Sequence, residues 1–141
     1  GYTISNDCPK YIMGDVHRLR QVVSNLLNNA IKFTSKGSIN LDVNCLNKEI
    51  QIAVTDTGIG IEKEHFEKIF KEFQQADSTT TRNFGGTGLG LSITRKIVEQ
   101  MLAKIEVESI LGIMTSFSVI VSVIVIGSGM INSSSLKIPK T

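Results

Sequence analysis

The sequence predicts an α+β fold, a two-layer sandwich in which helices cover one face of a mainly antiparallel sheet. Two observations predict it. Apolar residues recur at helical spacing in three segments, 16–33, 62–73 and 89–101. Apolar and polar residues alternate, as in half-buried strands, in one pair of segments after the first helix and in another pair after the last.

The first helix is predicted over 16–33. Asp15 stands directly before it and is a residue type that caps helix N-termini. The run Ser35-Lys36-Gly37 ends the periodic segment. The apolar positions form one wide face, made of Leu19, Val22, Val23, Leu26, Leu27, Ala30 and Ile31.

Strands are predicted at 39–45 and 50–54, joined as a hairpin by a short turn at Asn47-Lys48, and then at 105–107 and 117–125. The last strand lies in an uncharged run, 110–131, which is long enough to span a membrane. Alternation of β-branched residues and interruption by three glycines favour a buried strand instead.

One domain is expected over 1–126, with residues 1–4 as the remnant of an incomplete N-terminal strand. Residues 74–84 are polar and lack periodicity, which is typical of a mobile loop. Residues 127–141 end the chain with a serine-rich stretch and are expected to be a flexible tail.

Composition narrows the class of protein. A chain of 141 residues that is 41% apolar can close one core. A net charge of +2 gives no strong attraction to nucleic acid, so no nucleic-acid partner is expected. The two cysteines match no metal-binding spacing, so we expect a reducing, cytosolic location. We also expect the isolated domain to be monomeric.

The most informative motif is Gly85-Gly86-Thr87-Gly88-Leu89-Gly90-Leu91, which runs into the helix predicted at 89–101. Glycines let backbone N–H groups turn toward one point and let a ligand come close. The N-terminus of a helix adds unsatisfied N–H groups and the positive end of its dipole. Together they predict a polyphosphate site, whereas a glycine cluster alone would also fit a flexible loop.

A polar stripe runs along the first helix. At about 100° per residue, its members fall within about 80° of one another. They are Arg18, Gln21, Asn25, Asn29 and Lys32. Amide oxygens suit Mg²⁺ where a triphosphate already supplies negative charge. The alternative is an ordinary solvated helix face.

Asp56-Thr57-Gly58-Ile59-Gly60 follows the strand at 50–54 directly. A carboxylate just past a strand end can accept a hydrogen bond from an exocyclic amine, while glycines let a flat ring approach the backbone. A strand-to-helix turn is the alternative interpretation.

In this order, the Asn-bearing helix 25–33, Asp56-x-Gly58-x-Gly60, Phe70 with Phe73, and Gly86-x-Gly88-x-Gly90 closely resemble the N, G1, F and G2 boxes of sensor histidine kinases. The resemblance is to their catalytic ATP-binding domain, within the superfamily of topoisomerase, mismatch-repair and chaperone ATPases, and covers about residues 12–121. Gln74-Gln75-Ala76-Asp77, together with Thr81-Arg82, resembles the hybrid kinases, which also carry receiver domains.

The resemblance implies a Bergerat-type ATP-binding fold and a role for each matching residue. Asn29 would bind Mg²⁺, with Asn25 and Lys32 near the phosphates. Asp56 would accept from the adenine amino group. Gly58 and Gly60 would shape the floor under the adenine, and Thr115 would support its side. The remaining matches would anchor, occupy or hinge a lid over the triphosphate; they are Phe70, Phe73, Arg82, Gly86, Thr87, Gly88, Leu89 and Gly90.

The chain departs from the family pattern at two places. Leu102-Ala103 replaces a Gly-Gly pair, so the turn there must be rebuilt or strained if the glycines have φ > 0. Met114 replaces the second glycine of a Gly-x-Gly-Ser/Thr-x-Phe motif. Both changes could lower stability without touching the phosphate chemistry.

The resemblance implies transfer of the γ-phosphoryl group of ATP to a histidine of a separate dimerisation domain, with a receiver domain as the further partner. His17 and His65 lack the surroundings of that histidine. A catalytically degenerate scaffolding module is the alternative. A topoisomerase-like ATPase is disfavoured because Asn25 stands where such enzymes place a carboxylate base.

Overall fold

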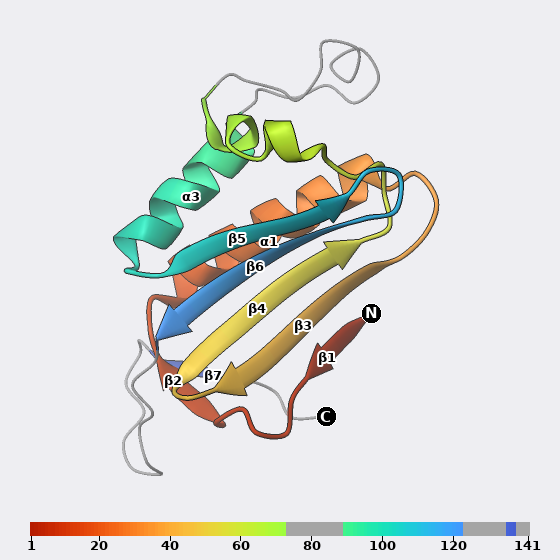
Figure 1. Ribbon diagram of the computed structural model, residues 1–141. Coiled ribbons are helices and arrows are strands. Elements are labelled where there is room, and N and C mark those ends of the chain that lie inside the picture. Colours follow the sequence, from red (N-terminus) through yellow and green to blue (C-terminus); the bar gives the residue numbers. More distant parts are fainter. Residues whose placement is uncertain (73–88, 123–134, 138–141) are drawn as a thin grey trace.

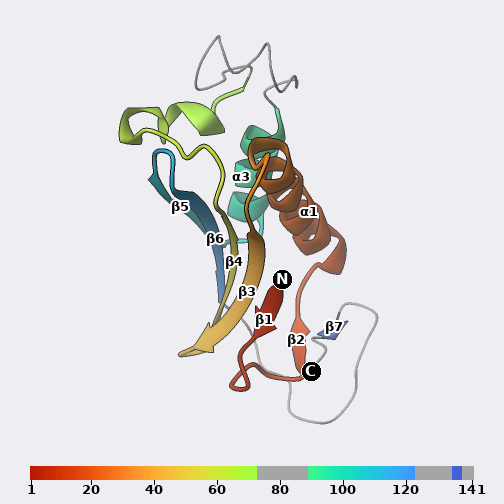
Figure 2. The same ribbon diagram turned by 90° about the vertical axis from the view of Figure 1, so that its right-hand side faces the viewer.

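The structure, a computed structural model, describes residues 1–72, 89–122 and 135–137. In the described part of the chain, a five-stranded sheet has two α-helices on one face (Figures 1 and 2). The strands in spatial order are β1 (Tyr2–Ile4), β3 (Ile39–Leu46), β4 (Glu49–Asp56), β6 (Met114–Ser122) and β5 (Lys104–Ile110). Only the β1–β3 pair is parallel. The predicted α+β sandwich is confirmed.

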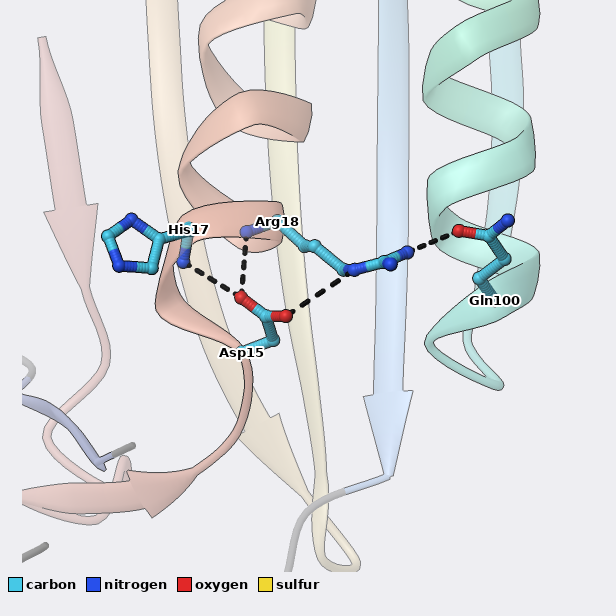
Figure 3. Close-up of polar contacts among 4 residues, drawn as sticks. All are labelled: Asp15, His17, Arg18 and Gln100. Carbon is cyan, nitrogen blue, oxygen red and sulfur yellow. Dashed lines mark hydrogen bonds and ion pairs between the residues drawn. The ribbon is translucent and has the colours of Figure 1, made fainter. Parts of the chain in front are cut away.

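Helix α1 (Val16–Phe33) has the predicted bounds and cap. The Asp15 carboxylate accepts from the backbone N–H groups of His17 and Arg18, at 3.1 and 3.0 Å (Figure 3). The Arg18 guanidinium lies 3.4 Å from the same carboxylate and donates to Gln100 of helix α3 (Gly90–Gln100). Arg18 therefore links the start of α1 to the end of α3.

The core lies between these helices and the sheet. α1 contributes Val22, Leu26 and Ala30, all buried. The facing residues are Val54 of β4, Phe117 and Val119 of β6, and Ile97 and Val98 of α3. Burial on alternate positions of β4 and β6 follows from the period of two in a strand with one covered face.

The predicted hairpin is present as β3 and β4, with Asn47 and Lys48 as the two-residue turn. Both have positive φ, 51° and 64°, as the turn type that matches the twist of the strands requires. β5 and β6 form a second hairpin around Gly112, whose φ is 72°.

The prediction of one helix over 62–73 is wrong for the part of that segment that the structure describes. Two short 3₁₀-helices are present instead, η1 (Lys63–His65) and η2 (Lys68–Phe70). Successive single turns place apolar residues three or four apart just as a continuous helix does. Since Ile69 is the only buried residue in the described part of this segment, packing gives little reason for a longer helix.

The uncharged run contributes β6 to the sheet, as the alternation predicted. Among the described residues, no helix is long and apolar enough to cross a membrane. The end of the predicted strand, 123–125, lies outside the described residues.

The expectation of a wholly flexible tail is wrong for Ser135–Lys137. These residues form β7, which pairs antiparallel with β2 (Tyr11–Met13) in a separate two-stranded sheet. A three-residue strand has unpaired N–H and C=O groups that another extended segment can satisfy, and the sequence pattern of the tail does not reveal such pairing.

Of the two departures from the family pattern, the one at Leu102 strains the backbone and the one at Met114 does not. α3 ends with the two hydrogen bonds of a Schellman motif, from Ala103 N to Val98 O and from Leu102 N to Glu99 O, both 3.0 Å. This places Leu102 at φ 55°, a conformation that favours glycine, and leaves its side chain 93% exposed. Met114 lies in β6 opposite Ile110 and does not have a positive φ.

We expect Leu102→Gly to raise the free energy of unfolding by about 0.5–1 kcal/mol. A positive φ costs a non-glycine residue about 1–2 kcal/mol, and the extra freedom of glycine in the unfolded chain offsets about 0.5–1 kcal/mol of that gain. Urea unfolding measures the difference. The control is Leu46→Gly, another exposed leucine but within a strand, which should lower stability. A Leu102→Gly variant no more stable than the unaltered chain would show that the turn carries no strain.

Candidate functional site

One group of predicted residues lies at the end of the sheet, on its helix-covered face. Asp56 ends β4 and is directly opposite Thr115 of β6, which is directly opposite Ser109 of β5. Directly opposed residues of antiparallel strands project from the same face. Asp56, Thr115 and Ser109 therefore form a row across three strands, called here the polar row.

Asp56 is 5% exposed. Its Oδ1 accepts from the Gly58 N–H at 2.8 Å. Burial raises the pKa of the carboxyl group above its ordinary value, while the Gly58 N–H and the Thr34 hydroxyl act in the opposite direction. The site thus holds a carboxylate whose charge is poorly solvated and which would gain from a hydrogen-bond donor.

Gly58 and Gly60 are both required by the chain's own backbone. A Cβ at Gly58 would lie 2.2 Å from the carbonyl oxygen of Phe33. Gly60 has φ 73°, and a Cβ there would lie 2.5 Å from the carbonyl oxygen of Ile110. The prediction that they shape the floor of a base site stays a prediction, since the close approach seen here is to α1 and to the β5–β6 hairpin.

Ser109 is a site residue that the sequence analysis missed. Its Oγ accepts from Ile61 N at 2.8 Å, donates to Met114 O at 2.7 Å and lies 2.8 Å from Thr115 Oγ1. It ties Ile61, which directly follows the Asp56–Gly60 loop, to Met114 and Thr115. The available signal was a polar residue at an inward position of an alternating strand, after Ile105 and Val107.

A second group lies where α1 meets α3. Asn25 Nδ2 donates to Thr94 Oγ1 at 3.2 Å, and Thr94 Oγ1 donates to the carbonyl oxygen of Gly90 at 2.8 Å. Since the hydroxyl proton of Thr94 is already used, Asn25 must present its NH₂ group. Among the described residues, its carbonyl oxygen on the other side of the carboxamide has no hydrogen-bond partner.

The rest of the polar stripe divides between two places. Asn29 is half-buried one turn after Asn25. Lys32 follows it, with Nζ 5.2 Å from the centre of the Phe33 ring. Gln21 is exposed, and Arg18 is engaged at the far end of α1 with Gln100. The site-forming part of the stripe is thus the C-terminal half of the helix.

Leu89 and Gly90 start α3. Within the described ranges, no side chain caps this N-terminus by a hydrogen bond, and Leu89 O accepts from Ser92 Oγ at 2.8 Å. A Cβ built on Gly90 meets nothing within 4 Å. As far as the described residues show, this N-terminus keeps its unsatisfied N–H groups for an anion. Five of the residues predicted to form or line a lid fall outside the described residues: Phe73, Arg82, Gly86, Thr87 and Gly88.

Phe70 packs between the sheet and α3. Its ring meets the Phe117 ring edge-on, with centroids 6.2 Å apart and an interplanar angle of 89°. The guanidinium of Arg95, on α3, lies 5.3 Å from the Phe70 centroid. Phe70 thus holds the segment before residue 73 against both layers, and Arg95, which the sequence analysis missed, is its partner on the helix.

The site has two chemically different ends. The polar row presents hydrogen-bond acceptors at the end of the sheet. Amide oxygens, the Lys32 ammonium group and an open helix N-terminus lie along α1 and at the start of α3. Such an arrangement suits a ligand with a hydrogen-bond-donating base at one end and anionic groups with a hard cation at the other.

Comparison with known proteins agrees with this arrangement. Residues 14–124 match the family described as histidine kinase-, DNA gyrase B-, and HSP90-like ATPase. The chain is 46% identical over 125 residues to hybrid signal transduction histidine kinase A of Dictyostelium discoideum, covering 80% of this chain and 6% of that protein. It is 44% identical over 112 residues to the autoinducer 2 sensor kinase/phosphatase LuxQ of Vibrio cholerae, covering 77% and 13%. The chain thus spans a small part of these relatives.

Solved structures show the same fold. Full-length ShkA in complex with AMPPNP superposes with a TM-score of 0.80 at 29% identity, over 91% of this chain and 26% of that one. The catalytic domain of histidine kinase ThkA superposes with a TM-score of 0.71 at 31% identity, over 86% of this chain and 76% of that one.

We expect Asp56→Asn to raise the thermal midpoint at neutral pH. Asparagine keeps an oxygen for the Gly58 N–H and removes a buried charge. Because the folded-state pKa of Asp56 is raised, its charge costs stability above that pKa, and the cost disappears as pH falls through it. The variant's advantage should therefore shrink on acidification. Asp42→Asn, at a half-buried strand position, is the control. An Asp56→Asn variant less stable than the unaltered chain at neutral pH would contradict the claim that the buried charge of Asp56 costs stability.

Proposed function

Because the chain belongs to the histidine kinase-, DNA gyrase B-, and HSP90-like ATPase family, as a histidine kinase ATPase domain, we propose that it binds ATP with Mg²⁺ and donates the γ-phosphoryl group to a histidine of a separate dimerisation domain. The observation that carries the proposal is the pairing of a buried carboxylate at one end of the site with α1 amides and an open helix N-terminus at the other.

The base end would recognise adenine. Asp56 would accept a hydrogen bond from the exocyclic amino group, with Thr115 beside it on β6. Burial strengthens this interaction because the carboxylate has lost much of its contact with water. That ShkA was solved with AMPPNP, an adenine nucleotide, supports this assignment.

The donor set on α1 fits Mg²⁺. Asn29 would bind the ion, and the carbonyl oxygen of Asn25 lies one turn earlier, on a carboxamide oriented by Thr94. Neutral oxygens are suitable where phosphate oxygens supply the remaining ligands and the charge. When bound, Mg²⁺ would neutralise negative charge on the phosphates during transfer.

The chain's own residues would act mainly by positioning. Lys32 would place a positive charge near the phosphates, and the N–H groups at the start of α3 would hold their oxygens. The terminal P–O bond of ATP breaks, an N–P bond forms at the acceptor histidine, and ADP leaves with the displaced electron pair. Asn25 cannot take a proton from water, which favours transfer to an external histidine over hydrolysis.

The acceptor histidine would come from another domain. His17 is exposed in the first turn of α1, and His65 lies in η1 with Nε2 3.6 Å from the Glu64 carboxylate. Neither belongs to the groups that form the site. Hybrid relatives support a dimerisation domain and a receiver domain as partners, and we propose a cytosolic position for this domain.

Isothermal titration with ADP and Mg²⁺ at pH 8 tests the base end. We expect Asp56→Asn to weaken binding about 10- to 100-fold, equivalent to the 1.5–3 kcal/mol of a hydrogen bond to a charged group. Asp42→Asn should bind as the unaltered chain does. Binding should also weaken as pH falls through the raised pKa of Asp56, because the protonated group loses its charge. Unchanged affinity in Asp56→Asn would exclude Asp56 as the base contact.

Phosphotransfer tests the catalytic end. We expect the chain, mixed with the dimerisation domain of its own protein and radiolabelled ATP, to produce acid-labile phosphate on histidine. Asn29→Ala should lower the rate about 100-fold, since it removes a ligand of the Mg²⁺ ion that would neutralise charge on the phosphates during transfer. The exposed neighbour Asn28→Ala is the matched control. ADP binding without any phosphohistidine would instead identify a scaffolding module.

A further inference from the structure

The Ser109 hydroxyl group is fully committed within the fold. Its oxygen accepts a hydrogen bond from the Ile61 N–H at 2.8 Å. Its single proton goes to the carbonyl oxygen of Met114 at 2.7 Å, because a carbonyl can only accept. A third contact, to Thr115 Oγ1 at 2.8 Å, remains to be assigned a direction.

Proton counting assigns that direction. A serine hydroxyl has one proton and two lone pairs, and the bonds to Met114 and Ile61 use the proton and one lone pair. Thr115 must therefore donate its proton into the second lone pair of Ser109. The Thr115 oxygen is left with two lone pairs and no proton to offer, so it can act toward any ligand only as an acceptor.

Thr115 lies directly beside Asp56 in the strand register, on the same face. The ionised Asp56 carboxylate is also an acceptor only. Both side chains are at most 5% exposed, so an opposing acceptor placed against them could not easily exchange its lost hydrogen bond for water. A ligand group entering between these two residues must bring hydrogen-bond donors.

We propose that Ser109 is a positioning residue that sets base selectivity by locking Thr115 as an acceptor. This inference rests on the proposed nucleotide site and adds to it. A 6-amino purine supplies donors at the position facing Asp56, whereas a 6-keto purine presents an acceptor oxygen there. The site should therefore reject the keto base through two residues rather than one.

A purely structural role for Ser109 makes a different prediction. If Ser109 only ties the Asp56–Gly60 loop to the β5–β6 hairpin, its loss would weaken all nucleotides equally. If it orients the Thr115 proton, its loss would free that proton to donate to a keto oxygen. The affinity ratio between 6-amino and 6-keto nucleotides separates the two roles.

The experiment measures dissociation constants for ADP and inosine diphosphate, which differ at the 6 position and in protonation of N1. In Ser109→Ala we expect the preference for ADP over inosine diphosphate to fall at least about threefold, the effect of one neutral hydrogen bond. Ser109→Thr, which keeps the hydroxyl group, should retain the preference. When Thr115 is already replaced by valine, Ser109→Ala should no longer change the preference for ADP over inosine diphosphate.

Two results would overturn this inference and leave the proposed function standing. One is a folded Ser109→Ala variant whose preference for ADP over inosine diphosphate is unchanged. The other is a Ser109→Ala substitution that lowers this preference equally with and without Thr115→Val. If Ser109→Ala does not fold, Thr115→Val and Thr115→Ser are compared instead. The preference for ADP over inosine diphosphate must then fall in Thr115→Val and be kept in Thr115→Ser, which retains the hydroxyl group. Absence of ADP binding by the unaltered chain would overturn the proposed function and this inference together.

Discussion

The contact on which the site depends is between the end of α1 and the loop that follows β4. The carbonyl oxygen of Phe33 accepts from Ile59 N at 3.2 Å, and a Cβ at Gly58 would lie 2.2 Å from the same oxygen. Only glycine allows this approach. It brings the amide-bearing face of α1 next to the end of the sheet, so one contact joins the two chemically different ends of the site.

One residue of the site, Asp56, lowers the stability of the fold. Asp56 is held at an inward position that Val54 and Ile52 occupy with apolar groups earlier in the same strand. Its buried charge opposes folding, and the Gly58 N–H only partly compensates. Such a cost persists where a ligand uses the group, which agrees with a recognition role for Asp56 rather than a packing role.

Most of the fold could be predicted from the sequence because periodicity reports burial directly. The bounds of α1 and the hairpin turn at Asn47-Lys48 follow from local rules, and the spacing of Asn25 and Asn29 places both on one helix face. The β2–β7 pair could not be predicted, since it joins segments about 120 residues apart with no distinctive pattern. Ser109 was missed for a related reason: its role arises from pairing between strands and a proton count, neither of which a single segment reveals.

The Leu102-Ala103 departure from the family pattern lies away from the groups that form the site, whereas Met114 stays in contact with it through the backbone carbonyl that accepts from Ser109. The strain at Leu102 is confined to the C-terminal end of α3, where the Schellman bonds still close the helix. At the other end, the chain from Asn25 through Thr94 to Gly90 holds the N-terminus of α3 against α1. Gly90 and Leu102 lie at opposite ends of α3, which is about three turns long, so the length of the helix separates the strained turn from the site. Divergence at that turn is therefore a matter of stability and is compatible with an intact nucleotide site.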